Sequence, residues 1–289
     1  MKTIGLAPNP HKENAVELAS ELADWLIERG IEVRITEETA GAMGKQQLGA
    51  SDEQVMECHL LVVLGGDGSM LRWSRMAAPK GLPMMGVNFG QYGFITEVHP
   101  DQAKSALAKI LAGEYSVSER VGLNVTVTRN GTQVASNYGL NDVVVSKGDI
   151  SRMLGLKTYV GNKYIVTYAA DGIIVASPTG STAYSLSAGG PVVHPDVCVL
   201  VITPICPHTL NVRSLVVPDS ESVQIVSEGR EDDPSMVLAV DGQLREHITG
   251  SDVVEIRRAD FTAKLVQFGP QTFYNKLQTR LRWGERFSN

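Results

Sequence analysis

Short apolar runs alternate with amphipathic stretches through the first hundred residues of the chain. Apolar side chains recur at helical spacing in two stretches, which predict helices at residues 15–29 and 69–78. The predicted strands are residues 2–7, 31–35, 59–64 and 84–87. The run HLLVVL at 59–64 is continuous, as in strands that are covered on both faces. This succession predicts an open α/β domain with a mostly parallel sheet.

The pattern changes to a period of two in the second part of the chain. A short helix over residues 101–111 leads into it, and Asn130-Gly131 is a strong hairpin signal. The predicted strands are residues 123–129, 136–146, 154–160, 162–169, 172–176, 197–203, 222–227, 236–240, 253–258 and 261–267. Helical spacing returns only in the tail, at residues 274–283. The pattern predicts an all-β, sandwich-like domain.

These patterns divide the chain of 289 residues into two expected domains. The first is an α/β domain over residues 1–98, joined by the C-terminal segment 270–289. The second, over residues 99–269, is the β-sandwich domain.

Composition narrows the expected environment and partners. The net charge is -6, with 26 basic and 32 acidic residues, so a general basic footprint for nucleic acid is absent. Phosphate groups must therefore be bound locally, by backbone N–H groups, a few basic side chains or a metal. The three cysteines lack metal-ligand spacing, and no apolar run approaches the ~18 residues needed to span a bilayer. We expect a soluble, cytoplasmic protein with no membrane partner and reduced thiols.

A glycine-rich turn follows the predicted strand 59–64. Gly65, Gly66 and Gly68 allow an anion to approach the backbone, and Ser69 is expected to cap the next helix. Asp67 would repel phosphate unless it holds a metal, accepts a proton or binds a hydroxyl, which are tasks of a kinase. The alternative is a plain glycine turn with Asp67 as a cap. The turn matches neither the Walker nor the dinucleotide-binding glycine pattern.

A second candidate site lies in residues 171–195, where glycines and small hydroxyl residues dominate. Such a surface lets a ligand approach the main chain and offers neutral hydrogen bonds. Tyr184 is a flat ring suited to stack on a base. The alternative is a long polar loop in which Tyr184 fills a gap in the core.

The two segments together resemble known kinases. Gly65-Gly66-Asp67-Gly68 resembles the GGDG motif of a superfamily that contains NAD kinases, diacylglycerol and sphingosine kinases, and 6-phosphofructokinases. Residues 171–195 resemble the signature of the NAD kinase family. Further blocks that resemble this family follow in its order, and the likeness covers roughly residues 60–285. These blocks are residues 88–95, 140–144, 207–215 and 241–243.

The resemblance implies a fold and an activity. It implies an N-terminal α/β domain, a C-terminal β-sandwich that binds NAD, and commonly a homodimer or homotetramer. The implied activity is phosphorylation of the adenosine ribose 2′-hydroxyl of NAD by ATP to give NADP, with Mg²⁺ or another divalent cation. The metal ligands are not readable from the sequence.

The resemblance also implies roles for individual residues. Asp67 matches the aspartate that accepts the proton of the ribose hydroxyl. Asp142 is a departure, since the family usually has Glu there, so its shorter arm must lie closer or use water. The implied phosphate loop is Gly65, Gly66, Gly68 and Ser69. The implied NAD contacts are Asp67, Gly68, Arg72, Asn141, Asp142, Arg152, Asp171, Thr182, Ala183, Tyr184, Ser185, Leu186, Ser187 and Gln243.

Some alternatives stay open. Arg152 could be a solvated surface residue, and Asp241 could support the site or only form an Asp-Gly turn. The chain could be another GGDG-type small-molecule or lipid kinase, although residues 182–187 do not suggest the apolar groove that a lipid needs. It could also be a non-catalytic NAD(P)H sensor, which would not need Asp67. The sequence does not distinguish NAD from NADH, or ATP from polyphosphate.

Overall fold

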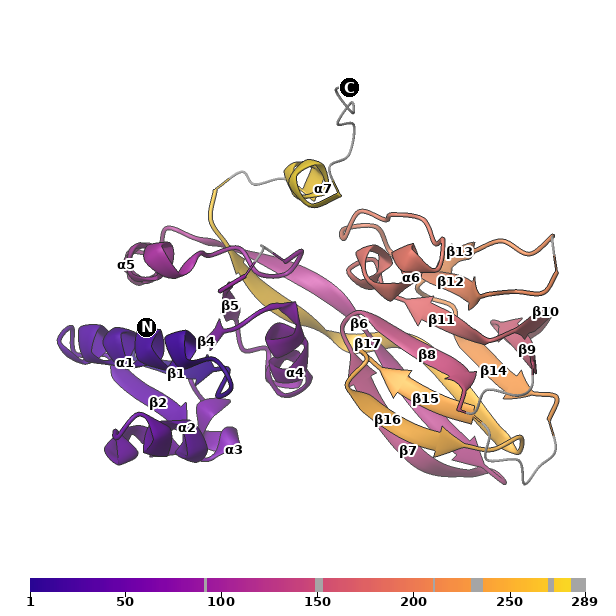
Figure 1. The fold of residues 1–289 in the computed structure, drawn as a ribbon, viewed down its shortest axis with the longest axis horizontal. Coiled ribbons are helices and arrows are strands. Elements are labelled where there is room, and N and C mark those ends of the chain that lie inside the picture. Colours follow the sequence, from indigo (N-terminus) through magenta and orange to yellow (C-terminus); the bar gives the residue numbers. More distant parts are fainter. Residues whose placement is uncertain (91–92, 149–152, 210, 230–235, 270–272, 282–289) are drawn as a thin grey trace. The chain divides into compact units, whose positions relative to one another are not determined.

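The computed structural model describes the chain outside residues 91–92, 149–152, 210, 230–235, 270–272 and 282–289. It forms two compact units (Figure 1). Unit 1 comprises residues 1–119 and 262–289, and unit 2 comprises residues 120–261.

Unit 1 contains a parallel sheet with the order β17-β5-β4-β1-β2-β3. Its central strand pairs Ile4 with Leu60 on one side and with Val33 on the other. The strands are β1 (Thr3–Pro8), β2 (Glu32–Thr36), β3 (Gly49–Ala50), β4 (Leu60–Leu64), β5 (Met84–Val87) and the end of β17 (Asp252–Gln267). The predicted α/β domain with a mostly parallel sheet is confirmed.

Helices cover this sheet. The longest, α1, buries apolar side chains that recur every three or four residues, as the sequence pattern predicts. The α-helices of unit 1 are α1 (Glu13–Ile27), α2 (Glu37–Ala42), α3 (Asp52–Val55), α4 (Asp67–Ala77), α5 (Ala103–Leu111) and α7 (Phe273–Leu281). Single 3₁₀ turns lie at η1 (Gln46–Leu48), η2 (Ala78–Lys80) and η3 (Pro100–Gln102). The core joins α1 and α5 to strands β1, β2, β4 and β5.

Unit 2 is an antiparallel β-sandwich, which confirms the predicted fold of the second domain. One sheet has the order β13-β12-β11-β8-β15-β16, and the other contains β10-β9-β14-β17, with β6 beside β17 and β7 beside β6. The first sheet comprises β8 (Asp142–Lys147), β11 (Gly172–Ala176), β12 (Val199–Ile205), β13 (Leu215–Pro218), β15 (Met236–Val240) and β16 (Leu244–Ile248). The remaining strands are β6 (Ser116–Arg129), β7 (Thr132–Gly139), β9 (Leu154–Val160), β10 (Lys163–Ala170) and β14 (Val223–Ser227).

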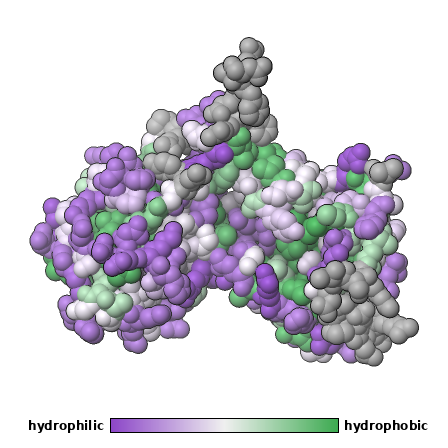
Figure 2. Space-filling model, viewed as in Figure 1, coloured by the Kyte–Doolittle hydropathy of each residue, from purple (hydrophilic) through white to green (hydrophobic). Residues whose placement is uncertain are grey.

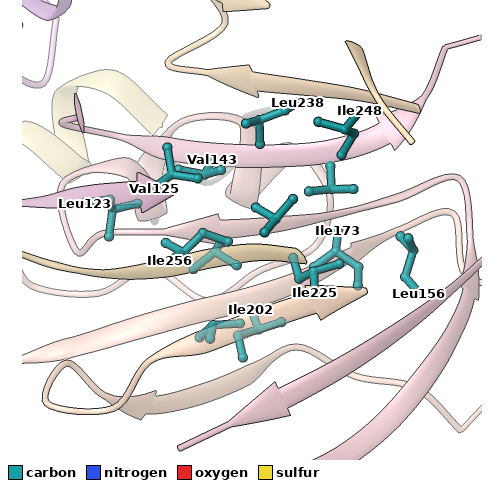
Figure 3. Close-up of a cluster of buried hydrophobic side chains, with 14 of the residues drawn as sticks. Leu123, Val125, Val143, Leu156, Ile173, Ile202, Ile225, Leu238, Ile248 and Ile256 are labelled. Carbon is teal, nitrogen blue, oxygen red and sulfur yellow. The ribbon is translucent and has the colours of Figure 1, made fainter. Parts of the chain in front are cut away.

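The core of unit 2 lies between its two sheets. Figure 3 shows side chains such as Val143 and Ile173 from one sheet and Ile225 and Ile256 from the other within one cluster. Each fully buried aliphatic side chain of this kind contributes about 1.5–3 kcal/mol. The opposite face of the first sheet is also apolar around Ile174, and a short segment with η4 (Gly180–Thr182) and α6 (Tyr184–Ser187) follows β11.

Three predicted strands differ from the observed ones. Residues 136–146 form β7 and β8, which belong to different sheets, because the chain turns at Leu140-Asn141. Residues 253–258 and 261–267 form one continuous strand, β17. The strands β13 and β16 were not predicted, and both are short.

The boundary between the units also differs from the predicted division at 98 and 270. Helix α5 lies in unit 1 because Ala103, Leu107 and Ile110 pack into the core around β1 and β4. The end of β17 lies there because Leu265 pairs with Met84 of β5. Strands β6 and β17 thus run from one unit into the other.

The surface differs between the units on the face drawn in Figure 2. Hydrophilic side chains cover most of this face of unit 1, whereas hydrophobic ones gather in patches on unit 2. Unit 2 exposes large apolar side chains that include Met153, Tyr164, Ile165, Tyr184, Val197 and Val216. Among the described residues, no helix is long and apolar enough to cross a membrane.

Candidate active site

The glycine-rich turn of unit 1 connects β4 to α4. The Gly65 N–H donates to the Val87 carbonyl at the end of β5 (2.8 Å), so the turn is fixed where two parallel strands end. Gly66 precedes the first helical residue, Asp67. Ser69 therefore lies inside the first turn of α4, and the expectation that it caps the helix is wrong. The N-terminus of α4 is suited to an anion because its N–H groups and dipole present positive charge.

The Asp67 carboxylate is held by a loop nearly thirty residues further along the chain. Its Oδ2 accepts hydrogen bonds from the backbone N–H groups of Phe94 (2.8 Å) and Ile95 (3.4 Å). Its Oδ1 accepts from the Thr96 N–H (3.1 Å) and the Thr96 hydroxyl (2.9 Å). These donors fix the orientation of the carboxylate beside the N-terminus of α4.

Residues of the sequence block 88–95 support the loop that binds Asp67. The Asn88 side chain donates to the Thr96 Oγ1 (3.1 Å) and accepts from the Gly90 N–H (3.0 Å). A Cβ on Gly93 would lie 1.7 Å from the Asp67 Oδ1, so only glycine fits while Asp67 keeps its place. The spacing of asparagine and glycines in this block therefore serves Asp67.

The other predicted residues of unit 1 lie on the first turns of α4. Gly68 and Arg72 are exposed there, and the Arg72 guanidinium lies 5.9 Å from the centre of the Trp73 ring. They share the helix with Asp67.

Unit 2 contains a pocket of about 500 Å³ that is lined by one face of strands β8, β15 and β16, by the turns that adjoin them and by the segment after β11. Four of the predicted site residues line it: Asn141, Asp142, Ala183 and Tyr184. The other lining residues are Val144, Ser146, Lys147, Gly148, Val237, Ala239, Asp241, Gly242 and Arg245. Tyr184 is 47% exposed, which does not favour the alternative that its ring fills a gap in the core.

Asp241 organises the wall of this pocket. Its carboxylate accepts hydrogen bonds from three successive N–H groups, those of Leu140 (2.9 Å), Asn141 (2.7 Å) and Asp142 (3.2 Å). Its own N–H donates to the Asp142 carbonyl (2.9 Å). Asp241 thus fixes the turn that carries Asn141, whose Oδ1 is buried without a hydrogen-bond partner. The residue does more than form an Asp-Gly turn.

Asp142 lies in a different environment from Asp241. It is 4% exposed, and burial, together with the nearby charge of Asp241, raises the pKa of its carboxyl to about 7. Near neutral pH the Asp142 carboxyl is therefore partly protonated, and it faces the pocket as both donor and acceptor.

The segment after β11 is tied to the same turn. The Ser177 hydroxyl donates to the Leu140 carbonyl (2.6 Å) and accepts from the Gly180 N–H (3.1 Å). A Cβ on Gly180 would lie 2.0 Å from the Asn141 carbonyl oxygen, so the backbones meet closely there. The hydroxyl and glycine pattern of this segment therefore serves close packing against the turn at Leu140-Asn141.

Several predicted residues lie away from the pocket lining. Ser185 is fully buried, and its hydroxyl pairs with that of Thr203 (2.9 Å). Thr182 donates its hydroxyl to the Thr179 carbonyl (3.2 Å). Leu186, Ser187 and Gln243 are also absent from the lining, and Ser187 and Gln243 are exposed. Arg152 lies outside the described residues.

Two basic residues of the pocket were not predicted. The Lys147 Nζ lies 2.7 Å from the Asp171 Oδ1, so Asp171 is an ion-pair partner of a lining residue. Arg245 lies on β16, opposite Ala239 of β15. In the sequence, each is only a basic residue near the end of a strand. Such residues are common on protein surfaces, so nothing distinguished these two as pocket residues.

The fold and these sites define a class of protein. An α/β unit with a glycine turn and a fixed aspartate, followed by an antiparallel β-sandwich with a polar pocket, is the architecture that the resemblance to GGDG-type kinases implies. Solved structures share the whole fold. A yeast NADH kinase in complex with NADH matches with a TM-score of 0.92 at 21% identity, covering 100% of this chain and 89% of that one. An Archaeoglobus fulgidus NAD kinase in complex with ATP gives 0.74 at 22% identity, with 98% and 99% covered.

Sequence comparison then identifies the family. The models of the ATP-NAD kinase N-terminal and C-terminal domains match residues 4–115 and 140–268. The NAD kinase of Moorella thermoacetica is 42% identical, covering 98% of this chain and 90% of the relative. That of Heliobacterium modesticaldum is 40% identical, covering 98% and 100%. The chain belongs to the ATP-NAD kinase family, and the predicted phosphotransferase with an alcohol group as acceptor is confirmed at this level.

Proposed function

We propose that the chain transfers the terminal phosphoryl group of ATP to the 2′-hydroxyl of the adenosine ribose of NAD, with Asp67 orienting that hydroxyl. The observation that supports this role is the fixed Asp67 carboxylate at the N-terminus of α4. A phosphoryl transfer of this kind depends mainly on positioning and charge stabilisation, so an acceptor held in place is more useful than a mobile one.

The proposed reaction requires Asp67 to contact the ribose hydroxyl. Of the four contacts to its carboxylate, that from the Ile95 N–H is the longest, at 3.4 Å. The ribose hydroxyl replaces this weakest donor at Oδ2. Asp67 then directs the hydroxyl oxygen at the terminal phosphorus of ATP and takes up the hydroxyl proton as the new O–P bond forms. The bond from that phosphorus to the bridging oxygen breaks, and ADP leaves.

NAD occupies the pocket of unit 2 in this proposal. The Oδ1 of Asn141 accepts a hydrogen bond from the ligand, because this buried oxygen otherwise lacks a partner. Tyr184 stacks its exposed ring on the adenine. Arg245 supplies positive charge toward the phosphates of the dinucleotide, and Lys147 holds Asp171 through their ion pair.

A divalent cation, Mg²⁺ by expectation, would neutralise charge on the phosphates of ATP. Among the described residues, no group of three or more His, Cys, Asp or Glu side chains could hold a metal ion. This fits Mg²⁺, which usually keeps several waters and binds phosphates with few protein ligands.

The proposal includes a homo-oligomer in the cytoplasm. Exposed apolar side chains on unit 2, such as Ile165 and Val216, favour a contact between copies of the chain. The free thiols of Cys58, Cys198 and Cys206 fit a reducing compartment. Light scattering of the purified protein tests the oligomer.

The decisive experiment measures NADP formation with NAD or NADH as acceptor and with ATP or polyphosphate as donor. Diacylglycerol and fructose 6-phosphate serve as control acceptors. We expect phosphorylation of NAD and Mg²⁺-dependent turnover that EDTA abolishes. Turnover only with a control acceptor would favour another GGDG-type kinase, and ligand binding without turnover would favour a sensor.

Asp67→Asn tests the role of the carboxylate. The amide keeps the shape but cannot take up the proton, so turnover should fall on the order of 10²–10⁴-fold. The affinity for NAD should change little. A large loss of affinity with normal turnover would contradict the assigned role.

A further inference from the structure

The C-terminal helix α7 contains a buried lysine where a polar helix would ordinarily expose one. Lys276 is 7% exposed and is the only buried residue of α7, whose neighbouring residues Tyr274, Asn275 and Gln278 are exposed. Lysine is rarely buried without a partner, since removing its charge from water is costly. A specific contact must therefore hold this side chain inside.

That contact is with the loop that carries the donors to Asp67. The Lys276 ammonium donates to the Phe94 carbonyl (3.2 Å) and forms an ion pair with the Glu97 carboxylate. Both charged side chains are buried. A buried ion pair often adds little net stability, because desolvation offsets the attraction, but its fixed geometry can specify one conformation.

The contacts of Lys276 and those of Asp67 involve the same short stretch of backbone. Lys276 binds the carbonyl of Phe94, and Asp67 binds the N–H of Phe94 (2.8 Å). Glu97 directly follows Thr96, whose N–H and hydroxyl also donate to Asp67. Residues 94–97 therefore link the ammonium of α7 to the carboxylate of α4, and all of these residues belong to unit 1.

We propose that Lys276 is a positioning residue for phosphoryl transfer. Together with Glu97 it fixes residues 94–97, and these residues fix the Asp67 carboxylate. The expected effect on kcat rests on the role proposed above for Asp67. The link from Lys276 through residues 94–97 to the Asp67 carboxylate does not. Loss of the ammonium should loosen the loop, turn the carboxylate away from its productive direction and lower kcat with little effect on the KM for NAD.

Backbone amide exchange, followed by NMR in the full-length protein, tests the structural link without turnover. Lys276→Met should raise exchange at Phe94, Ile95 and Thr96 at least tenfold relative to amides of α1. Lys276→Arg should restore most of the protection, because it keeps a cation that can reach Glu97 and the Phe94 carbonyl. Gln278→Ala, an exposed position on the same helix, is the matched control and should leave these amides unchanged.

Kinetics test the functional consequence. A displacement of about 1 Å in a catalytic group costs on the order of a hundredfold in rate, so we expect kcat of Lys276→Met to fall ten- to a hundredfold. Lys276→Arg should recover much of this loss. Lys276→Met alone leaves the buried Glu97 carboxylate without its cation, which could impair folding. Combining it with Glu97→Gln removes that charge, so the double variant serves as the test if the single variant folds poorly.

The outcomes separate the two proposals. Unchanged exchange at residues 94–96 in a folded variant overturns the positioning role, as does changed exchange with wild-type kcat while Asp67→Asn is inactive. If Asp67→Asn itself retains full turnover, the proposed role of Asp67 fails. Changed exchange in Lys276→Met would then still establish the link between α7 and the loop, but the assignment of Lys276 to phosphoryl transfer would fall.

Discussion

Three aspartates with different surroundings have different chemical properties at the residue scale. Asp67 accepts hydrogen bonds from the loop at residues 94–96, and Asp241 accepts hydrogen bonds from three successive backbone N–H groups. Asp142 is buried beside Asp241, and burial together with the charge of Asp241 raises the pKa of its carboxyl. The residue type supplies a carboxyl group, and its burial, its hydrogen-bond donors and the nearby charges decide whether it binds a ligand, supports the backbone or holds a proton.

Gly93→Ala should separate Asp67 from its loop. The new Cβ would lie 1.7 Å from the Asp67 Oδ1, so either the loop or the carboxylate must move. We expect a loss of about 1–3 kcal/mol in the free energy of unfolding and a ten- to hundredfold lower kcat. Gly41→Ala on α2, where a Cβ meets nothing within 4 Å, is the control for chemical denaturation and kinetics. Wild-type kcat in Gly93→Ala would contradict the close contact.

The Asp142 carboxyl should make the free energy of unfolding depend on pH. Because its pKa is raised from 3.8 to about 7 in the folded chain, the folded state binds more protons than the unfolded state between these values. Stability therefore falls as pH rises through this window. Asp142→Asn removes the effect and should stabilise the protein at pH 8 by up to about 4 kcal/mol, with little gain at pH 4.

Thermal unfolding of Asp142→Asn at several pH values measures this difference. Asp260→Asn, at an exposed position in the same unit, is the control. Equal gains for Asp142→Asn at pH 5 and pH 8 would show that the Asp142 carboxyl does not titrate between them.

At the scale of elements, the pocket of unit 2 depends on the turn between β7 and β8. The Asp241 carboxylate accepts hydrogen bonds from the N–H groups of this turn, and the hydroxyl of Ser177, which follows β11, donates to its Leu140 carbonyl. Because β7 and β8 belong to different sheets, this turn is also where the chain crosses the sandwich. The position of Asn141 therefore depends on the hydrogen bonds that Asp241 and Ser177 make to the backbone of the turn, and not on its own side chain.

Ser177→Ala should weaken this arrangement. The change leaves the Leu140 carbonyl without the hydroxyl donor and the Gly180 N–H without its acceptor. An unsatisfied buried group costs about 1–3 kcal/mol, and we expect a loss of stability in this range together with a higher Kd for NAD, measured by calorimetry. Ser136→Ala, at an exposed position on β7, should change neither quantity.

At the scale of the whole molecule, two separate cores support the two units. Leu22 is fully buried in the core of unit 1, and Ile173 is fully buried in that of unit 2. Replacing either by alanine should cost about 2–5 kcal/mol. Scanning calorimetry should show that each variant lowers mainly the transition of its own unit. A single transition shifted alike by both variants would mean that β6 and β17 couple the cores into one cooperative unit.

The sequence alone determined the local features of this protein. Helix α1, the buried strand β4 and the glycine turn at Gly65-Gly66 were predicted because hydrophobic period and glycine are properties of neighbouring residues. The order of the motif blocks also led to the kinase family. Asn141, Asp142, Ala183 and Tyr184, which the family resemblance implies as NAD contacts, line one pocket. Their contact with NAD stays a prediction.

Only the tertiary structure decided which groups meet. Asp67 contacts residues 27–29 positions away, Asp241 contacts amides 99–101 positions away, and Lys276 reaches Phe94 across 182 positions. Such hydrogen bonds leave no periodic trace, because the partners are brought together by packing of the core and not by local spacing. For the same reason, the alternation of apolar and polar residues over 136–146 predicted a single strand. It did not reveal the turn that places β7 and β8 in different sheets.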